Sequence, residues 1–406
     1  MKKLWHQFIQ VYLHEFRIIF RDQGIMIFLF FLPIAYPVIY SLIYNPELVR
    51  NVRMVVVDHD RTADSRELVR DLDACQEVWV IGYVPDMAAA RKVMSDHECY
   101  GILEIPAGYA KKIGRGEQAH AVLYSDMSLL LRYRGFLVAT TNVMSELGGK
   151  LMHRDLDTSL PLASTIMTGD PLPIANVNLG NLTGGFDSFI MVGLVVLILQ
   201  QSVILAVGMA GGAKRERRGL IGYNPVNASR STVITILGQS LCYITLLVLP
   251  IIWLLHYIPL VFQFPMAGNT LEIFCFILPV LLGSIMLGFC FQGIVGERED
   301  VFVLWVVTSV VFLFLSGLTW PRYAIHGFWK VLSDLVPATW GVEGFVRMNA
   351  NGASLSQVGE YYRNAWMLCG LYAVLAWFIQ RFVVRPQALR VNPQPIPGEP
   401  ETQGND

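Results

Sequence analysis

Long runs without a single charged residue are the feature that most constrains what this chain can fold into. A helix needs about 20 mostly apolar residues to cross the hydrocarbon core of a bilayer, and within it every backbone polar group finds its partner in the helix itself. Charge-free runs of this kind cover residues 24–44, 188–213, 273–296, 301–321 and 364–380. Each run predicts one membrane crossing.

A sixth crossing is predicted within residues 231–270, which are also uncharged. Pro259, Pro265 and Gly268 interrupt the second half of this stretch, and both residue types weaken helices. We therefore expect one helix followed by a loop here, and six transmembrane helices in all.

The composition excludes several other classes of protein. Of the 406 residues, 54% are hydrophobic and only 16% are charged, which is too apolar for an ordinary soluble protein. The formal net charge of -1 leaves no overall basic field for nucleic acid, so no nucleic-acid partner is expected. The six cysteines show no CxxC pair and no Cys/His ligand spacing, so no metal site is predicted.

The positions of lysine and arginine predict how the chain is threaded. Cytoplasmic ends of membrane helices are enriched in these residues. Lys2, Lys3, Arg17 and Arg21 precede the first run, and the cluster 214–218 follows the second. Six crossings then place both termini in the cytosol, including the tail 386–406, and the large segment 45–186 outside. The expected location is the inner membrane of a bacterial cell.

The segment 45–186 is predicted to form a separate folded domain. Short β-branched runs alternate with stretches of helical periodicity, beginning with "VRMVVVDHD" and "RTADSRELVRDLDAC". Such alternation predicts a small α/β domain with a partly parallel sheet. The predicted fold class is therefore an α-helical membrane protein with six transmembrane helices and an inserted extracytoplasmic α/β domain. The remaining five helices occupy 187–385.

Two residue groups in the outer domain are candidates for special chemistry. Cys75 and Cys99 form a candidate disulfide, because an oxidising compartment permits a bridge; two buried thiols are the alternative. Asp58, His59 and Asp60 are candidates for a catalytic cluster, but acidic residues at a strand end also begin turns and cap helices.

Polar side chains inside the predicted crossings form a further group. They are costly in lipid unless they face a partner or a cavity. Two interpretations stay open, namely hydrogen bonds between helices and a candidate translocation path. The glutamines in question are Gln200, Gln201, Gln239 and Gln292.

The N-terminal residues 1–23 predict an amphipathic helix at the membrane surface. Aromatic and aliphatic residues such as Trp5, Tyr12 and Ile19 recur at helical spacing, and Glu15 and Arg17 occupy other positions around the helix. This pattern is typical of an interfacial helix.

Four stretches, by their residues and by their places around the predicted helices, resemble those of a type 2 ABC (ABC-2) permease of the exporter subgroup with a large domain between the first two helices. "KRERRGLIGYNPVNASR" keeps Arg215, Glu216, Arg217 and Gly219 of a family pattern close to Glu-Arg-Glu-x-Gly-Thr, with Leu220 where threonine is usual. "VVVDHDRTADSREL" and "CYGILEIPAGYAKKIGRGE" are similar to the outer-domain signatures of the subgroup, and residues 315–348 to its outer helices.

The resemblance implies roles for these segments. Residues 213–229 would form a coupling helix that docks on a separate cytosolic ATPase subunit, with Arg215, Glu216, Arg217, Arg218 and Gly219 as contact residues; a basic stop signal at the membrane face is the simpler interpretation. Residues 1–23 would form the connecting helix. Residues 318–350 would form two short helices re-entering the outer leaflet.

The chain itself contains no GxxxxGK[ST] pattern, so it has no evident means of binding nucleotide. We therefore predict no catalytic residues and no directly bound cofactor, with ATP and Mg²⁺ held by the ATPase partner. The expected function is an exporter permease that moves an amphiphilic, lipid-like or drug-like substrate and pairs with a second copy or a paralogue. A periplasmic membrane-fusion protein and membrane lipid are further expected partners. The alternative is a mechanotransmitter whose outer domain regulates a partner without moving cargo.

Overall fold

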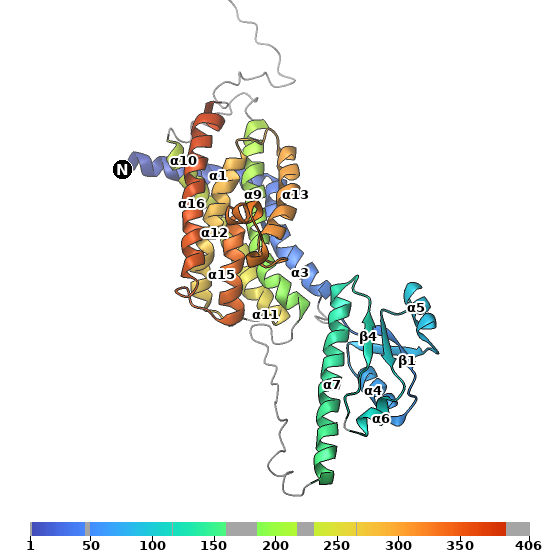
Figure 1. Ribbon diagram of the computed structural model, residues 1–406. Helices are drawn as coiled ribbons and strands as arrows, with labels where there is room; N and C mark the ends of the chain where they lie inside the picture. Colours follow the sequence, from blue (N-terminus) through green and yellow to red (C-terminus); the bar gives the residue numbers. More distant parts are fainter. Residues whose placement is uncertain are drawn as a thin grey trace, which may run out of the picture. The chain divides into compact units, whose positions relative to one another are not determined.

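The computed structural model describes residues 2–44, 49–115, 117–159, 185–216, 231–264 and 266–386. The chain divides into two compact units. One, here called the helical unit, comprises Met1–Asn45 and Asn178–Asp406, and the other, the sheet unit, comprises Pro46–Val177. Figure 1 shows the helices of the first and the strands of the second.

Five helices among the described residues are long and apolar enough to cross a membrane. Three of them contain a short π-helical turn. In chain order they are Gln23–Tyr44 (α2 Gln23–Met26, η1 Ile27–Phe31, α3 Leu32–Tyr44), α9 Phe186–Glu216, Thr232–Phe262 (α10 Thr232–Ile252, η4 Trp253–Tyr257, α11 Ile258–Phe262), α12 Thr270–Phe291, and Gly359–Val384 (α16 Gly359–Ile379, η6 Gln380–Val384).

The remaining predicted crossing corresponds to α13, Arg298–Leu315. Its 18 residues include three charged ones in the first turn, Arg298, Glu299 and Asp300. With three charged residues among 18, α13 is not one of the helices that are long and apolar enough to cross a membrane. A sixth crossing therefore stays a prediction.

The helix beginning at Thr232 extends further than the sequence suggested. Pro259, expected to break it, lies at the start of α11, directly after the π-helical turn η4. Proline lacks the N–H that would continue the helical hydrogen bonds, and Pro259 is accommodated where the π-helical turn η4 passes into α11. The helix ends instead at Gln263, which adopts a left-handed conformation with φ 56°.

The centre of the helical unit is α9, which is buried along almost its whole length. It packs against α12, α13 and α15, Pro337–Asn351, and α16 lies beside α12. Two short elements, η5 Arg322–Ala324 and α14 Phe328–Asp334, precede α15. The helix α14 and all but the last residue of α15 fall within the range 318–350, where two short helices were expected. An amphipathic helix, α1 Lys2–Arg21, packs on α10.

Glycines in α15 allow it to approach its neighbours closely. A Cβ atom at Gly344 would lie 2.2 Å from Cζ of Phe276 in α12, and one at Gly341 would lie 2.7 Å from a methyl group of Val196 in α9. Neither distance is compatible with a side chain unless the neighbour shifts, so these glycines set the spacing of α15 from the core.

Substituting Gly344→Ala is expected to lower the free energy of unfolding by about 1–3 kcal/mol, because the fully buried Phe276 ring must leave its packed position. Thermal unfolding in detergent measures the loss. Gly370→Ala in α16 is the matched control, since nothing lies within 4 Å of its Cβ position. Equal stability of the two variants would contradict this packing argument.

The sheet unit contains four strands in the order β2-β1-β3-β4. The central strand β1 runs parallel to β2 and β3, and β4 is antiparallel to β3. The prediction of a partly parallel sheet with alternating helices is confirmed. The elements are β1 Val52–Asp58, α4 Ala63–Asp73, β2 Val78–Tyr83, α5 Met87–Ser95, β3 Gly101–Ile105, α6 Tyr109–Ile113, β4 Val122–Ser125 and α7 Leu130–Ser159.

Two hydrophobic clusters cover the two faces of this sheet. Alternate residues of β1 point to opposite faces: Val52, Met54 and Val56 pack with α4, α6 and α7, whereas Val55 and Val57 pack with α5.

The candidate disulfide is not formed. Cys75 and Cys99 are both free thiols. Cys75 packs at the edge of the α4 and α7 cluster, and Cys99 is buried in the α5 cluster on the other face. The sheet therefore separates the two thiols, and the alternative of two packed cysteines describes them.

Candidate functional site

Charged side chains, two of them the buried carboxylates of Glu15 and Asp22, gather at the C-terminal end of α9, just before the predicted coupling segment. We call this group the α9 terminal network, and it draws residues from α1, α9, α10, α13 and η6 and from the caps of α2 and α12. Its members are Glu15, Asp22, Lys214, Arg215, Glu216, Gln239, Tyr243, Gln292, Arg298 and Gln380.

The carboxylate of Glu15 is the centre of one half of the network. Glu15 is only 1% exposed. Its Oε2 lies 2.5 Å from Nζ of Lys214 and accepts a hydrogen bond from Nε2 of Gln239 at 2.9 Å, while its Oε1 accepts from Oη of Tyr243 at 3.0 Å. An ionised carboxylate is retained in such a site only where a cation and further donors compensate its lost hydration. Glu15 therefore fastens α1 to both α9 and α10.

Arg298 holds the other half together. Its Nη1 lies 2.7 Å from Oδ2 of the buried Asp22, and its Nε lies 2.7 Å from Oε2 of Glu216. The backbone N–H of Arg298 also donates to Oε1 of Glu216 at 3.1 Å. Asp22 in addition caps α2 by accepting from the N–H groups of Gly24 and Ile25. One guanidinium thus joins the α1–α2 junction, the end of α9 and the start of α13.

Arg215 and Gln292 connect the network to α12 and α16. Arg215 donates to the backbone carbonyl of Gln292 at 2.5 Å. The Gln292 amide donates from Nε2 to the carbonyl of Val207 at 2.6 Å and accepts at Oε1 from Gln380 at 2.7 Å. Gly211 makes this possible, because a Cβ there would lie 2.6 Å from the Gln292 side chain.

The predicted coupling residues fall into two groups. Arg215 and Glu216 make the intramolecular contacts just described, so the structure uses them to fix the end of α9. Arg217, Arg218 and Gly219, with the rest of the predicted coupling helix, lie outside the described residues.

Three of the four glutamines predicted inside the membrane make hydrogen bonds between helices. Gln239 and Gln292 belong to the α9 terminal network. Oε1 of Gln200 accepts from the N–H of Ala338 in α15 at 2.6 Å. Gln201 is also buried, and neither polar atom of its side chain has a partner among the described residues. Three of the four therefore fit the interpretation of bonds between helices, and a translocation path stays a prediction.

The acidic cluster of the sheet unit stabilises loops. Asp58 accepts from the N–H groups of Asp60 and Arg61 and from the Ser65 hydroxyl, at 2.7–3.0 Å. Asp60 reaches across to the loop after β3 and accepts from the N–H groups of Gly108 at 2.7 Å and Ala110 at 3.0 Å. The sequence left two interpretations of these residues open, a catalytic cluster or residues that begin turns and cap helices. The hydrogen bonds of Asp58 and Asp60 fit the second interpretation. Among the described residues no group of three or more His, Cys, Asp or Glu is placed to hold a metal ion.

Replacing Asp60 is expected to loosen the start of α6. Burial raises the pKa of Asp60, but the hydrogen bonds from Ala110, Thr62 and Gly108 outweigh it, so the pKa lies below its ordinary value. The carboxylate therefore stabilises the fold above the pKa of the unfolded chain, and this contribution is lost as the pH falls through the lowered folded value. Asp60→Ala should cost about 1 kcal/mol, measured as faster hydrogen exchange over residues 106–113. Unchanged exchange, as expected for the exposed control Asp96→Ala, would contradict it.

Sequence reasoning missed the buried face of α1. The predicted apolar face included Trp5, which is 65% exposed, whereas Glu15, placed outside that face, is buried. The buried positions Val11, Glu15, Ile18 and Asp22 recur at i, i+4, i+7 and i+11, the spacing of one helix face. The presence of two acidic residues, Glu15 and Asp22, on this face is the sequence feature that could have indicated the network.

Comparison with known proteins gives one result that covers most of the chain. The family model described as "ABC-2 family transporter protein" matches residues 24–379. A search of curated proteins gives no match. The matched range includes all five membrane-length helices except the first residue of the first and the last residues of the fifth. The chain therefore belongs to the ABC-2 family of transporter proteins and is a multi-pass membrane permease.

Proposed function

We propose that this permease is the transmembrane subunit of an ATP-driven exporter that moves an amphiphilic, lipid-like or drug-like substrate out of the cytoplasm or the inner leaflet. A separate cytosolic ABC ATPase, holding ATP and Mg²⁺, would supply the energy. The observation that carries the proposal is the α9 terminal network, which connects the residues just before the coupling segment to helices throughout the helical unit. In this proposal the network lies at the cytosolic face of a bacterial inner membrane, and the sheet unit lies outside.

The network supplies a mechanical route from the ATPase to the membrane helices. A force on residues 217–230 acts first on Glu216 and Lys214, which are ion-paired to Arg298 and Glu15. The Lys214–Glu15 pair resists separation because the buried Glu15 carboxylate would be left uncompensated, and Arg298 is held in addition by the buried Asp22. Movement of the coupling segment would therefore displace α1, α9 and α13 together rather than bend the end of α9 alone.

The complete transporter would contain two permease subunits, as a homodimer or with a paralogue, and two ATPase subunits. ATP binding would bring the two coupling segments together and open a path between the permeases. A periplasmic membrane-fusion protein would receive the cargo, and membrane lipid would surround the helices.

The test is ATP hydrolysis by the permease–ATPase complex in proteoliposomes. Rhodamine 6G and a fluorescent phosphatidylethanolamine serve as amphiphilic probes, with transport followed by fluorescence. We expect at least one probe to stimulate hydrolysis and to move in an ATP-dependent manner, and both effects to be lost when the ATPase Walker A lysine is replaced. Hydrolysis that neither probe stimulates, with no movement of either, would favour the mechanotransmitter, since that class turns over ATP without cargo.

A further inference from the structure

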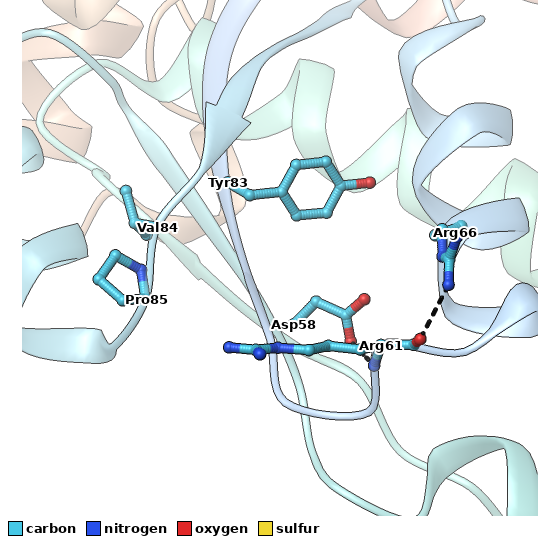
Figure 2. A pocket seen from close by; sticks show the side chains of 6 residues that line it. All are labelled: Asp58, Arg61, Arg66, Tyr83, Val84 and Pro85. Carbon is cyan, nitrogen blue, oxygen red and sulfur yellow. Dashed lines mark hydrogen bonds between the residues drawn. The ribbon is translucent and has the colours of Figure 1, made fainter.

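A cavity of about 450 Å³ opens in the sheet unit. It lies at the carboxyl ends of the parallel strands β1 and β2, the edge where open α/β sheets bind ligands. Its volume is in the range of small-molecule sites. Six residues line it, Asp58, Arg61, Arg66, Tyr83, Val84 and Pro85 (Figure 2).

The cationic groups of this cavity are available to a ligand. Both oxygens of Asp58 already accept hydrogen bonds from Asp60, Arg61 and Ser65. Among the described residues, Arg66 donates only to the backbone carbonyls of Thr62 and Arg61, at 3.1 Å each. The guanidinium groups of Arg61 and Arg66 form no ion pair with a carboxylate of the described residues. Two exposed guanidinium groups therefore share one cavity with a single carboxylate whose oxygens are in use.

The fixed backbone presents Arg61 to the cavity. Arg61 adopts a left-handed conformation with φ 52°, which is uncommon for a residue with a side chain. The bond from its N–H to Oδ1 of Asp58, at 2.9 Å, holds it there. In Figure 2 the Arg61 side chain extends below Asp58 toward the side of Val84 and Pro85, and Arg66 stands on the opposite side.

The other wall is apolar and comes from the end of β2. The pairing of β1 with β2 shifts between Met54 and Val55, so that Tyr83 pairs with Val56. Such a bulge re-aims the side chains that follow it, and here it turns Tyr83 toward α4, with its ring above Asp58 in Figure 2. The Tyr83 ring is 56% exposed, and Val84 and Pro85 continue the apolar surface. One ligand can thus meet cations and apolar groups together.

We propose that this cavity binds a small monoanionic carboxylate that carries an apolar or aromatic body. The carboxylate would pair with the guanidinium group of Arg61, whose planar fork matches its two oxygens, and Arg66 would add a second positive charge from the other side of the cavity. The apolar body would lie on Tyr83, Val84 and Pro85. A phosphate dianion fits less well, because Asp58 places a negative charge in the same cavity. The site is independent of the proposed transport function and of the α9 terminal network.

The test uses the full chain in nanodiscs of phosphatidylcholine, with 1-naphthylacetate as the probe and saturation-transfer NMR as the measurement. The neutral 1-naphthylacetamide and the dianionic 1-naphthyl phosphate are the comparison ligands. The variants are Arg61→Gln with Arg66→Gln, which removes both charges, and Arg61→Lys with Arg66→Lys, which keeps them. Arg91→Gln is the matched control, because Arg91 is an exposed arginine on α5, which covers the other face of the sheet.

We expect saturable binding of naphthylacetate, at least tenfold weaker binding of the amide, and weaker binding of the phosphate. The double glutamine variant should lose at least tenfold in affinity, the double lysine variant less, and Arg91→Gln nothing. Equal binding of acid and amide, tighter binding of the phosphate, full affinity in the double glutamine variant, or no saturable binding would each overturn the proposal. None of these results depends on ATP or transport, so failure here leaves the proposed function standing.

Discussion

Replacing Glu15 with alanine is expected to release α1 from the helical unit and to lower stability by about 3–5 kcal/mol, the usual cost of breaking a buried ion pair from one side. The side chain of Lys214 is only 13% exposed, so its ammonium would lose its counter-charge without gaining full hydration. Gln239 and Tyr243 would also lose the acceptor that they share.

Hydrogen exchange over residues 2–21 and thermal unfolding in detergent measure this effect. Arg17→Gln is the control, because Arg17 is an exposed residue two positions away on the same helix. Combining Glu15→Leu with Lys214→Met should recover part of the loss, since both charges then disappear together. Protection of α1 that is unchanged in Glu15→Ala would show that the carboxylate does not fasten this helix.

The second large effect is expected from Arg298→Ala. Removing the guanidinium leaves the buried Asp22 without its cation and frees Glu216 at the end of α9. The cost should be smaller than for Glu15, about 2 kcal/mol, because the Arg298 side chain is 32% exposed and water partly replaces it.

The functional consequence should exceed the loss of stability. If Arg298 transmits force from the coupling segment, Arg298→Ala should uncouple ATP hydrolysis from transport in the assembled complex, lowering transport per ATP at least tenfold. Arg298→Lys should restore part of the coupling, since one ammonium can pair with Asp22 or Glu216 but not both in the present geometry. Full coupling in a folded Arg298→Ala protein would contradict this role.

The membrane helices could be predicted within a few residues because lipid imposes a simple rule of length and charge. The run 24–44 became Gln23–Tyr44, and 188–213 became Phe186–Glu216. The exception was the helix that begins at Thr232, which was expected to end before Pro259. It continues past this proline after the π-helical turn η4. Local sequence does not reveal that adjustment, since it depends on the neighbouring residues of the helix and its packing.

The candidate site was predicted only in part. The basic and acidic residues after the second helix were identified, but their partners were not. Glu15 and Lys214 are 199 positions apart in the chain, and no periodicity within one helix encodes such a pairing. A buried acid on an amphipathic helix becomes informative only when the helix that supplies its cation is known.

The central claim is that a separate ABC ATPase drives this permease through the segment after α9. The most direct measurement is affinity purification of the tagged full chain in mild detergent, with mass spectrometry scored for ATPases that contain a Walker A sequence. The variant is Arg217→Glu with Arg218→Glu, chosen because Arg215 and Glu216 already have internal partners. Arg363→Glu is the control, because Arg363 is an exposed arginine near the start of α16, at the opposite end of that helix from Gln380 of the network. We predict that wild type and control retain an ABC ATPase and that the double variant loses it. An ATPase absent from all three, or retained equally by all three, would contradict the claim.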